Sequence, residues 1–457
     1  MRKKLFHYLG ELGWAAPYTK TRAESERSGC DMKQSPFWRG EQEHEHDIIS
    51  LAGEGIEKGL YPVKKERIVN MSEVNVETEA GSRKSWLGES AKSRLIEFII
   101  ETYSYHERTR IEKHSLLLTT GREEALKLLF DVLVKSGETV LTENPVSPVV
   151  LADLIRRQVK IVQVSCDAEG MLPGELRSQL ALQKPVLVYI TPDYSDTVGT
   201  SWSSIRRREI VEITRQAGIW LLSDRSSAEA PFAAEAGDSQ RGGRSLFEIG
   251  SDQRQHVRIA ELMSMDGHGI HAGWIRASEP LIQRLKDARE GRGSANGARD
   301  KRIRAEEALV RRIREAREGP GGVEDSCPGG VPAQMLVRPG FSWPQHAAAL
   351  NREYASRRAE ALAVLAGSRA LGAVCQHAAG SGRFLWAELP AGMDSGALLR
   401  AARLKGAAFL PGARCYAGAG NPRTLRLSLA EQSRQRLRLG LERICEAAEE
   451  FTARWEG

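Results

Sequence analysis

The chain has 457 residues, 41% of them hydrophobic and 28% charged, which is a globular composition with enough length for two or more domains. Its net charge of +6 comes from 66 basic and 60 acidic residues spread along the chain, whereas a nucleic-acid-binding protein carries a concentrated basic patch. No apolar run reaches the roughly 18 to 20 residues that a transmembrane helix needs. We therefore expect neither a nucleic acid nor a membrane as partner.

The six cysteines lie far apart and form no Cys-x-x-Cys motif. This spacing predicts reduced thiols in a cytoplasmic protein, with neither a disulfide framework nor a zinc site. Glycines interrupt the apolar part of the N-terminus, which argues against a secretory signal peptide. The cysteines are Cys30, Cys166, Cys327, Cys375, Cys415 and Cys445.

Residues 1–45 are polar and mixed in composition, and we interpret them as an N-terminal arm or linker with room for one short helix near residues 2–12. Residues 46–105 follow as a segment expected to pack on both later domains. An amphipathic helix is predicted within that segment, near residues 91–103.

Residues 106–290 alternate between short apolar runs rich in β-branched residues and segments with helical periodicity. Such alternation predicts an α/β domain whose mostly parallel sheet is covered by helices on both faces. Ser203 precedes one helical segment, and Gly137 and Gly218 each follow one, as expected at helix ends. The predicted strands are 139–142, 160–165, 186–190 and 219–224, and the predicted helical segments include 121–137 and 203–218.

The remainder divides into an insertion and a second domain. Residues 291–340 are charged and rich in glycine, which favours an irregular insertion. Residues 341–457 predict a smaller α+β domain that contains a long helix from residue 343, strand-like runs at 384–389 and 424–429, and a closing helix at 432–451.

The segment "RIAELMSMDGHGIHAGWI", residues 258–275, predicts a strand, a tight turn with three glycines and a second strand. The glycines would let the backbone pass close to another group. The turn offers only Ser264, Asp266, His268 and His271 as polar side chains.

Six segments, in this order, resemble the class I/II aminotransferases of pyridoxal 5′-phosphate (PLP) fold type I, and most closely the 2-aminoadipate-transaminase-like branch, whose domain also occurs in MocR-type regulators. The resemblance covers about residues 45–455. It implies PLP as cofactor, amino acid and 2-oxo acid ligands, amino-group transfer as reaction and a homodimer. The segments are residues 116–129, 137–151, 191–203, 219–232, 271–290 and 406–431.

Four positions keep a residue that the resemblance assigns to the site. Asp224 would hold the ring nitrogen of PLP, or would merely end a strand. Arg426 would grip the substrate carboxylate, or would form a surface ion pair. Gly121 begins the helix whose N-terminus would hold the phosphate. In the family a small hydroxyl or alanine follows this glycine, whereas here Arg122 could pair with a phosphate and Glu123 would repel one, or would simply suit a helix start without any ligand. Asn144 lies in the Asn-Pro turn beside the ring.

Several cofactor positions depart from the family pattern. Asp196 replaces an Asn that donates to the ring hydroxyl, Ser227 replaces a Tyr, and Ser147 replaces an aromatic residue that stacks on the ring. His271 stands where an Arg reaches the phosphate. Most importantly, Ser264 stands where the lysine forms the Schiff base, and no lysine occurs between Lys184 and Lys286.

Covalent PLP chemistry needs an amine that forms an imine and then moves a proton, and serine does neither. The sequence therefore predicts an impaired aminotransferase or a pseudoenzyme, with PLP bound noncovalently or lost. An active transaminase remains an alternative if Lys286 or Lys301 reaches the site from outside the turn. A ligand-sensing regulator is a second alternative, although residues 1–45 show no helix-turn-helix pattern.

Chemistry without PLP at His268, His271 and Asp266 is the least favoured hypothesis. Two histidines three residues apart could bind a metal, but the sequence shows no third and fourth ligand, and loop histidines that fill vacated space are the preferred interpretation.

Overall fold

A computed structural model describes residues 48–62, 89–107, 111–195, 197–226, 244–251, 258–291, 331–333, 336, 340–371, 375–376 and 382–453. The predicted arm, its short helix and most of the predicted insertion lie outside these residues. So do two of the predicted site residues, Asp196 and Ser227. The division of the chain into five segments stays a prediction.

An eight-stranded sheet lies within residues 116–277, with the strand order β2-β10-β8-β7-β6-β3-β4-β5. Neighbours from β8 to β4 run parallel, whereas β10 is antiparallel to β2 and β8, and β5 is antiparallel to β4. The predicted mostly parallel sheet is thus confirmed. The strands are β2 Leu116–Thr119, β3 Thr139–Asn144, β4 Lys160–Asp167, β5 Gly170–Met171, β6 Leu187–Ile190, β7 Trp220–Asp224, β8 Ile259–Ser264 and β10 Gly273–Ala277.

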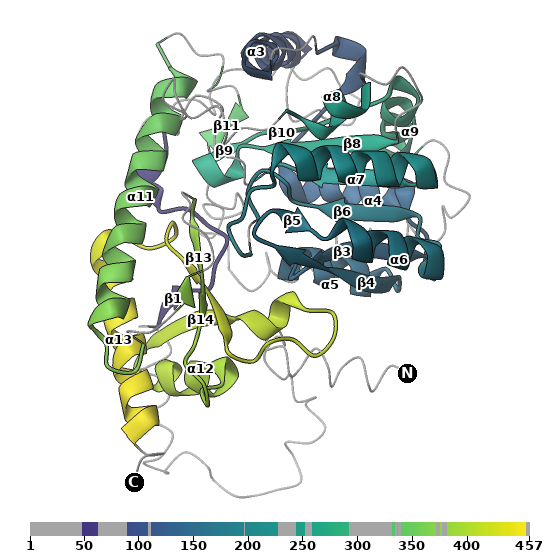
Figure 1. The fold of residues 1–457 in the computed structure, drawn as a ribbon. Coiled ribbons are helices and arrows are strands. Elements are labelled where there is room, and N and C mark those ends of the chain that lie inside the picture. The colour runs from purple at the N-terminus through teal and green to yellow at the C-terminus, as the bar shows by residue number, and fades with distance from the viewer. Residues whose placement is uncertain are drawn as a thin grey trace, which may run out of the picture. The chain divides into compact units, whose positions relative to one another are not determined.

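Helices cover both faces of this sheet (Figure 1). Successive side chains of a strand point to opposite faces, so Val140 and Leu187 pack with α4, α5 and α9, while Leu141 and Val188 pack with α6, α7 and α8. Burial on both faces explains why the strands are apolar almost throughout. The helices are α4 Arg122–Leu133, α5 Pro148–Arg156, α6 Pro173–Gln183, α7 Ser204–Ala217, α8 Leu246–Ser251 and α9 Glu279–Glu290.

A third apolar cluster joins the β2, β8 and β10 edge of the sheet to α3, Glu89–Glu107, and to the start of α11, Trp343–Gly367. In it, Trp274 of β10 packs edge to face against Tyr103 of α3, with ring centroids 5.0 Å apart. The predicted helix near 91–103 is therefore present and longer than expected. Within the described residues, no helix is both long and apolar enough to cross a membrane.

A second sheet, of order β1-β14-β15-β13-β12, belongs to the C-terminal part of the chain. Its first strand comes from the N-terminal side, because β1 pairs parallel with β14. Helices α11 and α13 lie side by side, and α12 packs on α13 (Figure 1). The elements are β1 Ile49–Leu51, β12 Cys375–Gln376, β13 Phe384–Glu388, β14 Ala407–Pro411, β15 Thr424–Ser428, α12 Ser395–Leu404 and α13 Arg434–Ala453.

Short elements complete the description. A two-stranded parallel pair joins β9, Ile270–His271, to β11, Val331–Pro332. Short 3-10 helices within the described residues are η4 Lys58–Leu60, η7 Lys113–Ser115, η8 Asp266–His268 and η10 Gly412–Cys415.

The helix-end signals behave as expected at α7. The Ser203 hydroxyl accepts a hydrogen bond from the backbone N–H of Arg206 at 3.2 Å. Gly218 ends the helix with a φ of 67°, a left-handed conformation that glycine adopts without steric cost.

A buried ion-pair network holds the loop after β6 against β7 and α7. Asp193 accepts from Arg225, which follows β7, and its Oδ1 lies 2.6 Å from Nη1 of Arg207 on α7. Burial opposes ionisation of Asp193, but the guanidinium groups of Arg207 and Arg225 outweigh it and lower the pKa of this carboxyl to about 2.

Asp193→Asn should therefore destabilise the protein by about 2 kcal/mol at neutral pH, because the folded state lowers the carboxyl pKa. The stabilisation is complete above the unfolded pKa of about 3.9 and is lost as the pH falls toward the folded value. Urea denaturation of both proteins between pH 7 and pH 3 measures this. A difference that is as large at pH 3 as at pH 7 would contradict the prediction.

Candidate functional site

Several of the predicted site residues lie at the carboxyl end of the parallel strands, where ligands of open α/β sheets bind. They are Gly121, Arg122, Asn144, Asp224 and Ser264. Asp224 ends β7, and the next strand, β8, ends at Ser264. Gly273, the first residue of β10, pairs with Ser264 on one side and with Thr119 of β2 on the other. Gly121 and α4 follow Thr119 directly, so the start of α4 lies beside the turn that follows β8.

Asp224 is buried and accepts four hydrogen bonds. Its Oδ2 accepts from Arg122 Nε at 2.8 Å and from the Tyr189 hydroxyl at 2.6 Å. Its Oδ1 accepts from the Ser226 backbone N–H at 3.0 Å and from the Ser226 hydroxyl at 2.5 Å. Because a carboxylate offers about four acceptor sites, these four donors saturate Asp224.

The electrostatics of Asp224 depend on Arg122. Burial disfavours the charged carboxylate, but the Arg122 guanidinium, Ser226 and Tyr189 outweigh it and lower the pKa of Asp224. The Arg122 side chain is 11% exposed and the Asp224 side chain 1% exposed, so the ion pair is almost dry. The Arg122 side chain thus points toward the carboxyl end of β7, where it pairs with Asp224.

The start of α4 is covered by a carboxylate. Asp266 Oδ2 accepts from the Arg122 backbone N–H at 2.8 Å. A Cβ atom at Gly121 would lie 2.6 Å from the same oxygen, so a larger residue there would push the Asp266 carboxylate away. The Asp266 side chain therefore stands against the helix N-terminus, where backbone donors and the helix dipole favour an anion.

Local bonds hold Asp266 in this place. The Ser264 hydroxyl accepts from the Asp266 backbone N–H at 3.1 Å and closes the turn after β8. His271 Nδ1 lies 3.5 Å from Asp266 Oδ1. Gly273 has to be glycine, because a Cβ there would lie 2.6 Å from the Thr119 hydroxyl and 3.0 Å from the Gly121 backbone.

His268, which the sequence offers as a metal ligand with His271, lies in an apolar environment. It is buried against Trp343, with ring centroids 5.0 Å apart. Burial, with smaller contributions from His346 and Arg383, lowers the pKa of His268 to about 3, so the ring is neutral at neutral pH. Among the described residues, no three His, Cys, Asp or Glu side chains are grouped to hold a metal ion.

Arg426 lies buried in the second sheet and faces a residue from the N-terminal side of the chain. Its Nη2 donates to Glu54 Oε1 at 2.5 Å, and its guanidinium lies 4.2 Å from the centroid of the Phe384 ring. Arg383 joins them, with Nη1 donating to the Glu54 backbone oxygen at 2.7 Å and Nη2 lying 3.9 Å from Glu54 Oε2.

Three arginines determine the charge of Glu54. Burial opposes its ionisation, but Arg426, Arg383 and Arg122 together lower its pKa. Since Arg122 acts on both Asp224 and Glu54, the two ion pairs belong to one electrostatic cluster.

The Asn-Pro turn after β3 contributes two buried polar atoms that, unlike those of Asp224 and Glu54, have no hydrogen-bond partner among the described residues. They are Asn144 Oδ1 and Ser147 Oγ. Asn144 ends β3, and the turn is held to η10 by a bond from the Val146 N–H to the Cys415 oxygen at 2.9 Å.

Sequence reasoning missed three of these contacts. Glu54 stands between Gly53 and Gly55, and this local pattern alone gives no sign of its partner Arg426. Asp266 was considered only for metal or catalytic chemistry. Tyr189 carries no signal, because it looks like any other apolar residue of β6.

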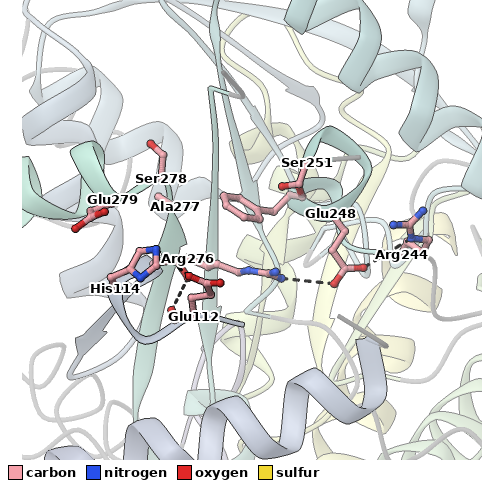
Figure 2. Close-up of a pocket in the computed structure, with 11 residues that line it drawn as sticks. Glu112, His114, Arg244, Glu248, Ser251, Arg276, Ala277, Ser278 and Glu279 are labelled. Atoms are coloured by element: carbon pink, nitrogen blue, oxygen red, sulfur yellow. Dashed lines mark hydrogen bonds and ion pairs between the residues drawn. The ribbon is translucent and has the colours of Figure 1, made fainter. Parts of the chain in front are cut away.

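A separate pocket of about 290 Å³ lies at the other end of β8 and β10 (Figure 2). Figure 2 shows Arg276 extending toward Glu248, with Nη1 3.6 Å from Oε1. Arg276 also lies 4.7 Å from the centroid of the Phe247 ring. None of the predicted site residues lines this pocket.

Comparison with known proteins finds relatives along most of the chain. The chain is 23% identical over 415 residues to aromatic-amino-acid aminotransferase 1 of Thermococcus litoralis, covering 88% of each chain. It is 22% identical over 336 residues to 2-aminoadipate transaminase of Thermus thermophilus, covering 73% of this chain and 75% of the relative. No protein-family model matches the chain.

A solved structure shares the fold. The crystal structure of LysN, an α-aminoadipate aminotransferase of Thermus thermophilus complexed with N-(5′-phosphopyridoxyl)-L-leucine, superposes with a TM-score of 0.68 at 22% identity. The superposition covers 90% of this chain and 95% of that chain. This similarity confirms the predicted fold, a PLP fold type I architecture.

Arg122→Leu should cost about 3 to 5 kcal/mol of stability, because it leaves the buried Asp224 carboxylate without its cation. Adding Asp224→Asn should recover part of this loss, so that the double variant is more stable than the two single losses predict by addition. Urea denaturation of the four proteins measures the coupling.

A matched control is Arg156→Leu, which removes a 76% exposed arginine paired with Asp153 and should change stability by at most about 1 kcal/mol. Strict additivity of Arg122→Leu and Asp224→Asn would contradict the structural assignment.

Proposed function

The homologues and structural neighbours of this chain are class I/II, PLP-dependent aminotransferases, and from this relation we propose that it is an aminotransferase-fold protein that has lost the amino-group transfer of its relatives. The observation that carries the proposal is Ser264 at the end of β8, where the resemblance places the Schiff-base lysine. An alcohol forms no imine and does not accept the substrate proton as an amine does.

The Ser264 hydroxyl already has a structural role. It accepts from the Asp266 N–H and closes the turn that positions Asp266 at the start of α4. Serine suits this turn because its short side chain can bond to the backbone two residues ahead. The residue thus supports the local fold without supplying a nucleophile.

No lysine of the neighbouring sequence replaces it. The chain has no lysine between Lys184 and Lys286. Lys286 belongs to α9, whose Leu281, Ile282 and Leu285 pack in the core with α4 on one face of the sheet. This location supports a role for Lys286 on the outer layer of helices. Lys301, the other lysine that an active transaminase could use, lies outside the described residues.

The homologues imply PLP as cofactor, and when bound it supplies an electron sink to an amino acid. The residues here do not fit that group. Asp224, which would hold a ring nitrogen, has all its acceptor sites filled, and the helix that would hold a phosphate already carries a carboxylate.

Two further properties belong to the proposal by family resemblance. We propose a homodimer, the usual assembly of symmetric oligomers and of this fold. We also propose the cytoplasm as location, because scattered cysteines without a pairing pattern are typical of a reducing compartment.

The protein should form no covalent bond to PLP. With PLP added and borohydride applied, intact mass spectrometry should show the unmodified chain, and the absorbance spectrum should be that of free PLP. Thermus thermophilus 2-aminoadipate transaminase, treated in parallel, is the positive control. A stoichiometric pyridoxyl group on any lysine, or turnover of 2-aminoadipate or aromatic or branched amino acids with 2-oxoglutarate, would overturn the proposal.

A further inference from the structure

Three contacts in the candidate site have a common character. In each, a group that the resemblance assigns to cofactor or substrate is instead bound by a side chain of the chain itself. The contacts are the α4 N-terminus with Asp266, Asp224 with Arg122, and Arg426 with Glu54.

The charges match those of the missing ligands. A helix N-terminus that would bind a phosphate binds the Asp266 carboxylate, which is also an anion. A carboxylate that would bind a protonated ring nitrogen binds the Arg122 guanidinium, which is also a cation. An arginine that would bind a substrate carboxylate binds the Glu54 carboxylate.

We propose that Asp266, Arg122 and Glu54 act as built-in substitutes for the phosphate, the ring nitrogen and the substrate carboxylate, so that the site is self-occupied and closed to PLP and amino acids even without covalent chemistry. This inference rests on the proposed function and extends it from catalysis to binding. It explains why two acidic side chains stand where anions would otherwise bind.

A ligand would have to displace all three substitutes. Arg122 and Asp224 are nearly dry, so separating them leaves buried charges unpaired. An incoming phosphate would also meet the Asp266 charge at the helix start, and an incoming carboxylate would meet Glu54. Each approach is therefore opposed by a like charge.

The two acidic substitutes are accessible enough to change without disrupting the core. The Asp266 side chain is 31% exposed and the Glu54 side chain 33% exposed. Asp266→Asn and Glu54→Gln keep the shape of each side chain and remove its charge. Circular dichroism and thermal unfolding establish that both variants are folded.

The phosphate position is tested with pyridoxine 5′-phosphate, which lacks the aldehyde and cannot form an imine. Isothermal titration of the native chain should show no saturable binding up to roughly 1 mM. Asp266→Asn should bind inorganic phosphate at least about tenfold more tightly than the native chain, because a like charge is removed from the helix start.

The matched control is Glu123→Gln, which removes one negative charge from the same helix start without removing the Asp266 contact. Equal gains for Asp266→Asn and Glu123→Gln would overturn the inference for this position, because net charge alone would then explain the result.

The substrate position is tested with succinate as a carboxylate probe. Glu54→Gln should bind succinate at least about tenfold more tightly than the native chain, because Arg426 is then paired with a neutral amide. Glu388→Gln is the control, since it removes a carboxylate that pairs with Arg423 and leaves Glu54 in place.

The outcomes separate the two proposals. Saturable binding of pyridoxine 5′-phosphate to the native chain, without any pyridoxyl attachment, would overturn the self-occupied site and leave the loss of catalysis intact. Tight succinate binding by the native chain would overturn the assignment of Glu54. Covalent attachment of PLP would overturn both proposals, and the absence of both binding and attachment supports both.

Discussion

The buried pair of Arg122 and Asp224 is the interaction on which the arrangement of the site depends. It connects the first residue of α4 to the last residue of β7, and through Tyr189 it also includes β6. The same arginine donates its backbone N–H to Asp266, so one residue contacts both the carboxyl end of β7 and the turn after β8. Its charge further stabilises Glu54 in the ionised form. Replacing its side chain would remove the bonds to Asp224 and Tyr189 and the charge that acts on Glu54.

Much of the fold could be predicted from the sequence because it depends on short-range patterns. The apolar runs that form β3, β4, β6 and β7 lie in a sheet covered by helices on both faces. Strands of this kind are recognised in a sequence as nearly uninterrupted runs of apolar residues. Helix α4 showed its periodicity, and Ser203 and Gly218 marked the ends of α7 within one residue. The six family-like segments lay in the right order, which fixed the architecture.

The partners of the site residues could not be predicted in the same way. Asp224 and Arg122 are 102 positions apart, and Arg426 and Glu54 are 372 positions apart. No local pattern connects such pairs, since only the folded chain brings them together. The sequence correctly predicted that Asp224 ends a strand and that Arg426 lies within one. It left open whether Arg122 would pair with a phosphate. Only the folded chain shows that Arg122 forms an ion pair with Asp224.

The Asp266 contact at the start of α4 has a consequence for how such a protein can change over generations. In a site of this construction, a single Ser264→Lys replacement would restore the amine but would face an anion at the helix start, a saturated Asp224 and a paired Arg426. Several replacements would be needed before any of them conferred an advantage, and an intermediate that lost Arg122 alone would be less stable.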